Sequence, residues 1–191
     1  KLSCAEGMVC LSSVIHMAVS LLCRVVQSCI GSMMSSLPPK ICPCQPNSAQ
    51  ARRYADCCQP IHADITRAER PEQLMRARYS AFCLSLSDFL IDSWDPAHCP
   101  ARADLEGAGP QWLALEILDS GQDADTGMVR FHATFFEQVK FQQLQELSRF
   151  HHDGHHWRYV DGDAEWQTLT PGRNSLCPCG SGKKIKRCCT A

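Results

Sequence analysis

The sequence predicts an α+β domain in which N-terminal helices cover one face of a curved antiparallel sheet, with a small cysteine-rich unit on each side of it. Two observations carry this prediction. The apolar period changes from helical to alternating after residue 110, and eight of the 14 cysteines fall into two short clusters. The length of 191 residues suits one globular domain with attachments and is too short for two full-sized domains.

The helical part of the domain begins at Pro71, a residue type favoured in the first turn of a helix. Apolar residues keep a helical period from Leu74 to Phe82. Ser87 is a candidate cap for a second helix, which Asp95-Pro96 ends.

Four strands are expected after the helices, because apolar and polar residues alternate there. The segment 120–127, rich in Gly and Asp, predicts the first turn, and Asp153-Gly154 predicts a two-residue hairpin. Helices followed by an antiparallel meander indicate an α+β domain. The expected strands are Trp112 to Leu118, Met128 to Phe136, Phe141 to Phe150 and Trp157 to Val160.

The overall charge of −1 conceals an uneven distribution. Residues 40–58 carry a net +2, residues 59–172 a net −9, and residues 173–191 a net +5 with no acidic residue. A hydrophobic content of 45% excludes a largely disordered chain. The low net charge argues against a protein coated in positive charge for wrapping nucleic acid.

The C-terminal cysteine cluster has the spacing of metal ligands. Two thiols one residue apart, then eight residues, then two adjacent thiols can close a tetrahedral zinc site. Gly180 and Gly182 permit a tight turn beside the sulfurs. A basic tail with free or oxidised cysteines is the alternative, although a disulfide between adjacent cysteines is strained. The four residues are Cys177, Cys179, Cys188 and Cys189.

The N-terminal cluster is a looser copy of the same pattern. Its two pairs, Cys42 with Cys44 and Cys57 with Cys58, are separated by twelve residues instead of eight. The extra length costs about 0.4 kcal/mol of closure entropy, against roughly 10 kcal/mol or more from a structural zinc. We expect a second Zn²⁺ here, with replacement of one thiolate by His62 as an alternative.

These residues carry a resemblance to a known family. The C-terminal segment CPCGSGKKIKRCC resembles the SEC-C motif, the zinc knuckle at the C-terminus of the preprotein translocase ATPase SecA, and the layout of residues 41–189 resembles the bacterial YchJ family. The resemblance implies a knuckle at each end of a cone-like domain similar to nuclear transport factor, and no defined reaction. The family pattern has an eight-residue gap in the first knuckle too, so the gap of twelve is a departure. The supporting stretches are Leu74 to Phe82, Phe89 to Trp94, Ser148 to Phe150, Trp157 to Gly162 and Gly172 to Asn174.

The open end of such a cone forms a pocket in some related folds, including isomerases and dehydratases, so a small-molecule or enzymatic cone is the alternative function. Arg76 with Tyr79, and Arg78 with Asp92, are equally well explained as structural hydrogen-bonded pairs. No Ser/His/Asp or paired-carboxylate signature stands out, which favours a protein that is not an enzyme. The candidate pocket residues are Arg76, Arg78, Tyr79, Asp92 and Trp94.

Four histidines flank the Asp153-Gly154 turn, which predicts His152 opposite His155 and His151 opposite His156. Such cross-strand pairs can chelate Zn²⁺, Ni²⁺ or Cu²⁺, but a solvated hairpin tip is the simpler interpretation.

The basic C-terminal tail indicates a docking surface for a protein partner, an expectation that the resemblance to the SecA knuckle supports. Charge compensation of the zinc thiolates is the alternative. Nucleic acid or the ribosome is the weaker choice of partner, because no aromatic residue stands between the basic ones. The residues concerned are Lys183, Lys184, Lys186 and Arg187.

Residues 1–33 lie outside this argument. The apolar run from Met8 to Ile30 is interrupted by polar residues, including Arg24, and is a poor membrane span. We interpret residues 1–33 as a non-native upstream or signal-like segment. Metal-bound thiolates then place the protein in the cytoplasm, without a membrane partner.

The sequence therefore predicts a zinc-binding accessory or adaptor protein. Its expected parts are an N-terminal knuckle at 41–62, a nuclear-transport-factor-like cone at 68–166 and a C-terminal knuckle at 173–191.

Overall fold

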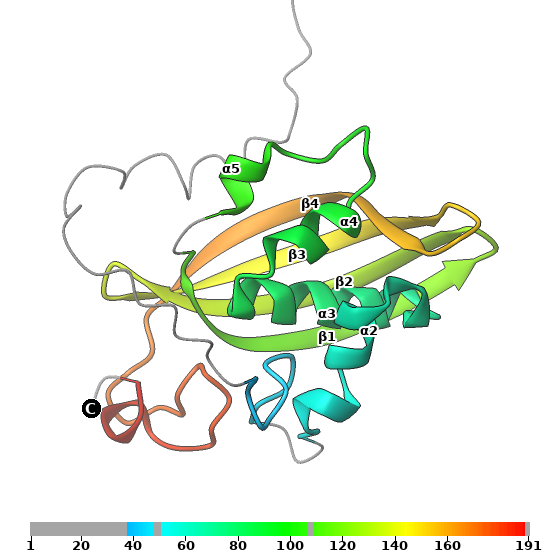
Figure 1. The fold of residues 1–191 in the computed structure, drawn as a ribbon. Helices are drawn as coiled ribbons and strands as arrows, with labels where there is room; N and C mark the ends of the chain where they lie inside the picture. The colour runs from blue at the N-terminus through cyan, green and yellow to red at the C-terminus, as the bar shows by residue number, and fades with distance from the viewer. Residues whose placement is uncertain (1–37, 48–50, 107–108, 190–191) are drawn as a thin grey trace, which may run out of the picture.

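The computed structural model describes residues 38–47, 51–106 and 109–189, so the interpretation of residues 1–33 lies outside it. A short helix between two 3₁₀ turns comes first, followed by three helices and then a four-stranded antiparallel meander (Figure 1). The sheet order is β1-β2-β3-β4. This confirms the α+β prediction of helices packed on a curved antiparallel sheet.

Helix α3, Pro71–Leu84, covers the sheet. Its start is fixed by Pro71 and by the Gln73 side chain, which accepts a hydrogen bond from the Arg70 backbone N–H at 2.9 Å. Its end is fixed by Ser85, whose left-handed backbone closes the last turn. Leu74 and Ala77 on its inner face are fully buried against the sheet.

The other helices are short. They are α4, Ser87–Asp92, and α5, Arg102–Leu105, after α3, and α2, Gln59–Ala63, before it. The described residues also form three 3₁₀ turns: η1, Tyr54–Asp56; η2, Ile65–Arg67; and η3, Ile185–Arg187.

The strands are longer than the alternation predicts. They are β1, Gln111–Asp123; β2, Thr126–Glu137; β3, Lys140–His152; and β4, Trp157–Leu169. The turn predicted at 120–127 is shorter in the structure, because strand pairing continues as far as Asp123 and Thr126. The outer part of the prediction is wrong, since Gly121 pairs with Met128 inside the ladder. Strand β4 continues nine residues past Val160, where Ala164 and Trp166 alternate with charged and amide side chains, so the expected strand stops short of this part of the pattern.

The hairpin after β3 is also wider than predicted. His152 pairs with Trp157 and His151 with Arg158, so residues 153–156 form the connection. The expected cross-strand histidine pairs do not form, because the turn has four residues instead of two. Its geometry is fixed by Asp153, whose Oδ1 accepts the backbone N–H groups of His155 and His156 at 2.9 Å.

The β2–β3 hairpin turns through Gln138 and Val139, both with positive φ of 48° and 64°. A two-residue turn of this kind favours Asn-Gly, because a β-branched side chain is strained in the left-handed region. No Gly, Asn or Pro marks this turn in the sequence, which explains why turn chemistry alone does not locate it.

A Gln138→Asn/Val139→Gly variant is therefore expected to be more stable than the wild type. Relief of the left-handed strain is worth about 1 kcal/mol, or a rise of roughly 2–4 °C in Tm. Val139→Ala is the matched control, since it removes the exposed apolar side chain and keeps the strained Cβ. Differential scanning calorimetry decides: equal Tm changes in the two variants contradict the strain explanation.

Candidate metal centres

The C-terminal knuckle is a closed loop held by backbone hydrogen bonds. Cys177 N–H donates to the Lys183 carbonyl at 2.8 Å, Gly180 N–H to the Cys177 carbonyl at 3.1 Å, and Cys188 N–H to the Ile185 carbonyl at 3.0 Å. Gly180 adopts a φ of 76°, which a side chain would strain. Ile185 is buried beneath the loop. These bonds bring the four sulfurs of the C-terminal cluster together, all within 4.8 Å of one another.

The sulfur positions fit a tetrahedral metal ion. Cys179 Sγ lies 3.5 Å from Cys188 Sγ, which lies 3.9 Å from Cys189 Sγ. A tetrahedron with metal–sulfur bonds near 2.3 Å, the zinc value, has edges of about 3.8 Å. A disulfide needs about 2.05 Å, so none of these contacts is one.

The N-terminal knuckle repeats the same hydrogen bonds despite its longer loop. Cys42 N–H donates to the Arg52 carbonyl at 2.9 Å, Gln45 N–H to the Cys42 carbonyl at 3.3 Å, and Cys57 N–H to the Tyr54 carbonyl at 3.1 Å. The four extra residues therefore lie between Gln45 and Arg52 and leave the ligand-holding turns unchanged.

Its sulfur geometry fits a metal equally well. The four sulfurs of Cys42, Cys44, Cys57 and Cys58 lie within 4.8 Å of one another. Cys44 Sγ is 3.6 Å and Cys58 Sγ is 4.0 Å from Cys57 Sγ. The structure therefore brings together all eight cysteines that the sequence singles out, in two groups of four.

His62 is not free to replace a thiolate. Its Nε2 is 2.8 Å from the Ala77 carbonyl and its Nδ1 is 2.6 Å from the Tyr54 hydroxyl. Since the carbonyl can only accept, Nε2 carries the proton and Nδ1 accepts from Tyr54. Burial lowers the pKa of His62, which agrees with a neutral ring. The alternative that His62 is a ligand is wrong, because both of its ring nitrogens are already hydrogen-bonded and the sulfur group contains the four cysteines alone.

The thiols of the first group shift one another's pKa through their hydrogen bonds. Hydrogen bonding from Cys44 lowers the pKa of Cys42, and the same contact raises the pKa of Cys44. Hydrogen bonding to Cys42 likewise raises the pKa of Cys58. A bound dication takes the place of these protons, so metal binding is opposed by acid.

The two knuckles are attached to the domain differently. Cys42, Cys44 and Cys58 belong to the main core together with Leu74 and Ala77 of α3, and Cys42 Sγ lies 3.6 Å from Ser80 Oγ on that helix. Cys177 and Cys179 belong to a second, smaller cluster with Phe141 and Ile185. Figure 1 shows both knuckles below the sheet, on the same side of the domain.

Comparison with known proteins agrees with this architecture. A family model described as "YchJ, middle NTF2-like domain" matches residues 70–162, and the SEC-C motif matches residues 173–189. The UPF0225 protein SG1365 of Sodalis glossinidius is 42% identical over 156 residues, which cover 78% of this chain and 96% of that protein. This chain belongs to the YchJ family, also named UPF0225.

Other members and two solved structures show the same likeness. The UPF0225 protein YchJ of Shigella dysenteriae is 42% identical over 157 residues, 78% of this chain and 97% of that protein. A SEC-C motif protein from Psychrobacter arcticus has a TM-score of 0.56 at 29% identity, covering 80% of this chain and 97% of its own. RPA3114 from Rhodopseudomonas palustris, also a SEC-C motif protein, has a TM-score of 0.54 at 29% identity over 63% of this chain and 98% of its own.

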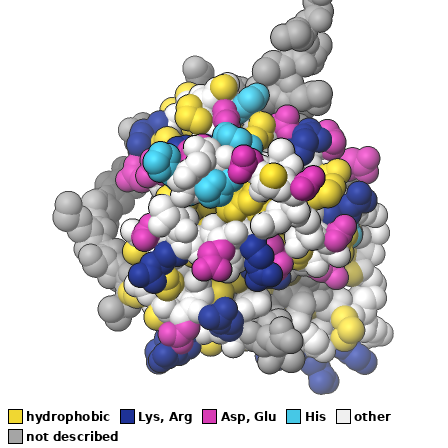
Figure 2. Space-filling view, turned by 90° about the vertical axis from the view of Figure 1, so that its right-hand side faces the viewer, with side chains coloured by type: hydrophobic (Ala, Val, Ile, Leu, Met, Phe, Trp, Pro, Cys, Tyr) yellow, Lys and Arg dark blue, Asp and Glu magenta, His cyan; other side chains and the backbone are white. Residues whose placement is uncertain are grey.

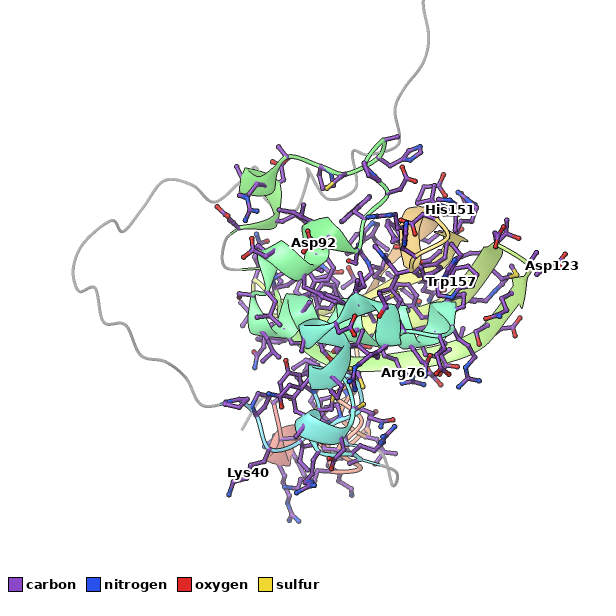
Figure 3. All side chains as sticks on the ribbon, turned by 45° about the vertical axis from the view of Figure 1, so that its right-hand side comes forward. Lys40, Arg76, Asp92, Asp123, His151 and Trp157 are labelled. Atoms are coloured by element: carbon purple, nitrogen blue, oxygen red, sulfur yellow. The ribbon has the colours of Figure 1, made fainter. Side chains whose placement is uncertain are left out.

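The five candidate pocket residues of the YchJ cone are not gathered around a common cavity. Arg76 forms an ion pair with Glu72 at 2.8 Å on the same helix, and Tyr79 packs edge-on against Trp112. Figure 3 shows Arg76 and Asp92 apart, on α3 and α4. Two surface pockets lie among the described residues, and neither is lined by any of these five side chains.

Arg78 fills the cone interior instead of lining a pocket. Its guanidinium is held between the rings of Trp94 and Tyr159, at 4.4 and 4.5 Å from the ring centroids. It donates to Ser93 Oγ at 2.6 Å and to the Leu90 carbonyl at 3.2 Å. The alternative pairs Arg76–Tyr79 and Arg78–Asp92 are therefore wrong, because Arg76 binds Glu72 and Arg78 donates to Ser93 and the Leu90 carbonyl.

Glu146 is the interior residue that sequence reasoning missed. Burial raises the pKa of this carboxyl group, which accepts hydrogen bonds from Ser148 at 2.5 Å and from the Tyr159 hydroxyl at 3.1 Å. A Cβ at Gly162 would stand 2.3 Å from Glu146 Oε1, so the carboxylate needs this glycine. Gly162 inside a strand is the sequence signal that marks such a close approach.

Among the described residues, no helix has the length and apolar character that a membrane crossing requires.

Proposed function

We propose that this protein is a zinc-binding accessory protein whose C-terminal knuckle docks on a protein partner. Both cysteine groups hold Zn²⁺ in a structural role, since four thiolates leave no coordination position for water or substrate. Metal-bound thiolates persist in a reducing compartment, so the same proposal places the protein in the cytoplasm. The filled interior around Arg78 favours this role over an enzymatic cone.

The observation that carries the docking proposal is the exposed face of the C-terminal knuckle. Lys183, Lys184, Lys186 and Arg187 are all exposed, and within the described ranges none of them forms an ion pair with a side chain closer than 4 Å. Leu176, 67% exposed, pairs across the knuckle with Lys184. Figure 2, which views the molecule from the side opposite the C-terminal knuckle, shows further lysine and arginine side chains along the lower edge of the molecule.

An apolar hollow adjoins this basic face. It has a volume of about 410 Å³ and lies between the knuckle and the sheet. Positive charge beside an apolar hollow fits an acidic protein segment that carries one apolar anchor. Its lining includes Val139, Lys140, Phe141, Leu169, Pro171 and Ile185.

Charge reversal tests the proposal with defined probes. A labelled acidic peptide with a single leucine and a labelled single-stranded RNA are titrated against the wild type and a K183E/K184E/K186E/R187E variant. The peptide is expected to bind the wild type and to lose at least 10-fold in affinity in the variant, and to weaken with salt. An Arg102→Glu variant, reversed at a distant exposed site, is the control. Peptide affinity unchanged by the reversal, or binding of RNA alone, contradicts docking of a protein.

A further inference from the structure

The enlarged loop of the first knuckle touches the second knuckle. Asn47 Nδ2 donates a hydrogen bond of 2.6 Å to the backbone carbonyl of Cys179. Asn47 Cβ also lies 3.8 Å from the point where a Cβ of Gly180 would stand. Asn47 and Cys179 are 132 residues apart in the chain. The two knuckles thus meet at the peptide group that joins the sulfur ligand Cys179 to Gly180.

This contact arises from the feature that sets the first knuckle apart. Between Gln45 and Arg52 the loop has four more residues than the equivalent loop between Gly180 and Lys183. Asn47 lies inside that longer stretch and has no counterpart in the shorter loop. The insertion leaves the hydrogen bonds of its own knuckle intact and reaches across to the other.

The acceptor of this bond is part of the second metal centre. The Cys179 carbonyl belongs to the peptide group that enters Gly180, whose φ is 76° and whose N–H closes the turn on Cys177. A donor on that carbonyl fixes the peptide plane next to the Cys179 sulfur. Groups outside the ligand set that orient a ligand in this way change metal affinity severalfold.

Asn47 in turn depends on the first metal centre. It lies three residues after Cys44, in the loop that a metal closes between Cys44 and Cys57. With the first site empty, the loop regains conformational freedom, and holding Asn47 against Cys179 then costs entropy.

We propose that Asn47 is a positioning residue for the second metal centre and that it couples the two centres, so that each metal strengthens the binding of the other. This rests on the proposed zinc binding. The coupling is reciprocal, since linkage between two binding equilibria acts equally in both directions.

The first arm of the test removes the hydrogen-bond donor. Zinc affinity is measured on the full chain by competition with a chromophoric chelator, and ¹¹³Cd NMR assigns the second site as the resonance that Cys189→Ser removes. Asn47→Asp, of the same shape but without the N–H, is expected to weaken the second site by about 3- to 10-fold. Asn47→Gln, which keeps a donor, is expected to restore part of the loss. Gln45→Ala, in the same loop, is the matched control.

The second arm tests the coupling itself. Cys189→Ser is expected to weaken the first site by the same factor, and adding Asn47→Asp to it is expected to produce no further loss. The proposal is overturned if the wild type and Asn47→Asp bind zinc at the second site with equal affinity. It is also overturned if the losses of first-site affinity caused by Asn47→Asp and by Cys189→Ser add in full. Absence of zinc from the wild type is a separate result, which overturns the proposed function instead.

Discussion

A Cys58→Ser variant is expected to lose much of the stability of the whole domain, whereas Cys189→Ser is expected to leave the cone folded. Cys58 is 1% exposed and lies in the main core with α3. Loss of the first metal releases the segment that covers this helix, including the bond from His62 to Ala77. We expect a loss of about 4 kcal/mol or more, or a fall in Tm of at least about 10 °C.

The matched variant separates the metal from the packing. Cys189 is exposed, and its knuckle belongs to the smaller cluster at the end of the sheet. Cys189→Ser is therefore expected to lower the Tm of the cone by less than about 3 °C. Thermal unfolding followed by near-ultraviolet circular dichroism measures both. Equal falls in Tm would show that the first knuckle is not part of the main core.

Replacement of Arg78 by methionine is expected to be the most damaging change inside the cone. Arg78 is 3% exposed, and its removal leaves Ser93 Oγ and the Leu90 carbonyl without their charged donor and takes a positive charge away from the Glu146 carboxylate. Loss of hydrogen bonds from a buried charged group is expected to cost about 3 kcal/mol. Arg76→Met on the same helix is the control, because the half-buried pair of Arg76 with Glu72 contributes at most about 1 kcal/mol.

The loss in Arg78→Met depends on pH in a defined direction. Burial raises the folded-state pKa of Glu146 above its unfolded value, and the positive charge of Arg78 opposes this rise. A raised folded pKa gives a contribution that is complete below the unfolded pKa and is lost as the pH rises through the folded pKa. The variant raises this pKa further, so the deficit relative to wild type is expected to be smallest in acid and to widen toward neutral pH. Urea unfolding across pH measures it, and a deficit that grows on acidification contradicts the role of Glu146.

The features that the sequence predicts well are those decided by local chemistry. The spacing of the cysteines is enough to group Cys177 with Cys189 and Cys42 with Cys58, because short loops bring them together whatever the rest of the chain does. Helix α3 follows from Pro71 and the apolar period of its buried face.

The features that it misses depend on distant partners. Strand β4 extends to Leu169 because β3 pairs with it, although its residues past Val160 are mostly exposed. The partners of Arg78 come from α4 and β4, which no spacing along α3 reveals. The bond from Asn47 to Cys179 joins the two knuckles, and in the sequence it appears only as an unexplained lengthening of a loop.

The number of zinc ions per chain, measured by native mass spectrometry on the reduced protein, tests the two proposed metal centres most directly. Two zinc ions are expected in the wild type and one in a Cys188→Ser/Cys189→Ser variant. One zinc ion in the wild type and none in the variant would show that the first knuckle, with its twelve-residue loop, does not bind the metal. No zinc in the fully reduced wild type would contradict the account at its centre, and the eight cysteines would then have to be explained as redox groups.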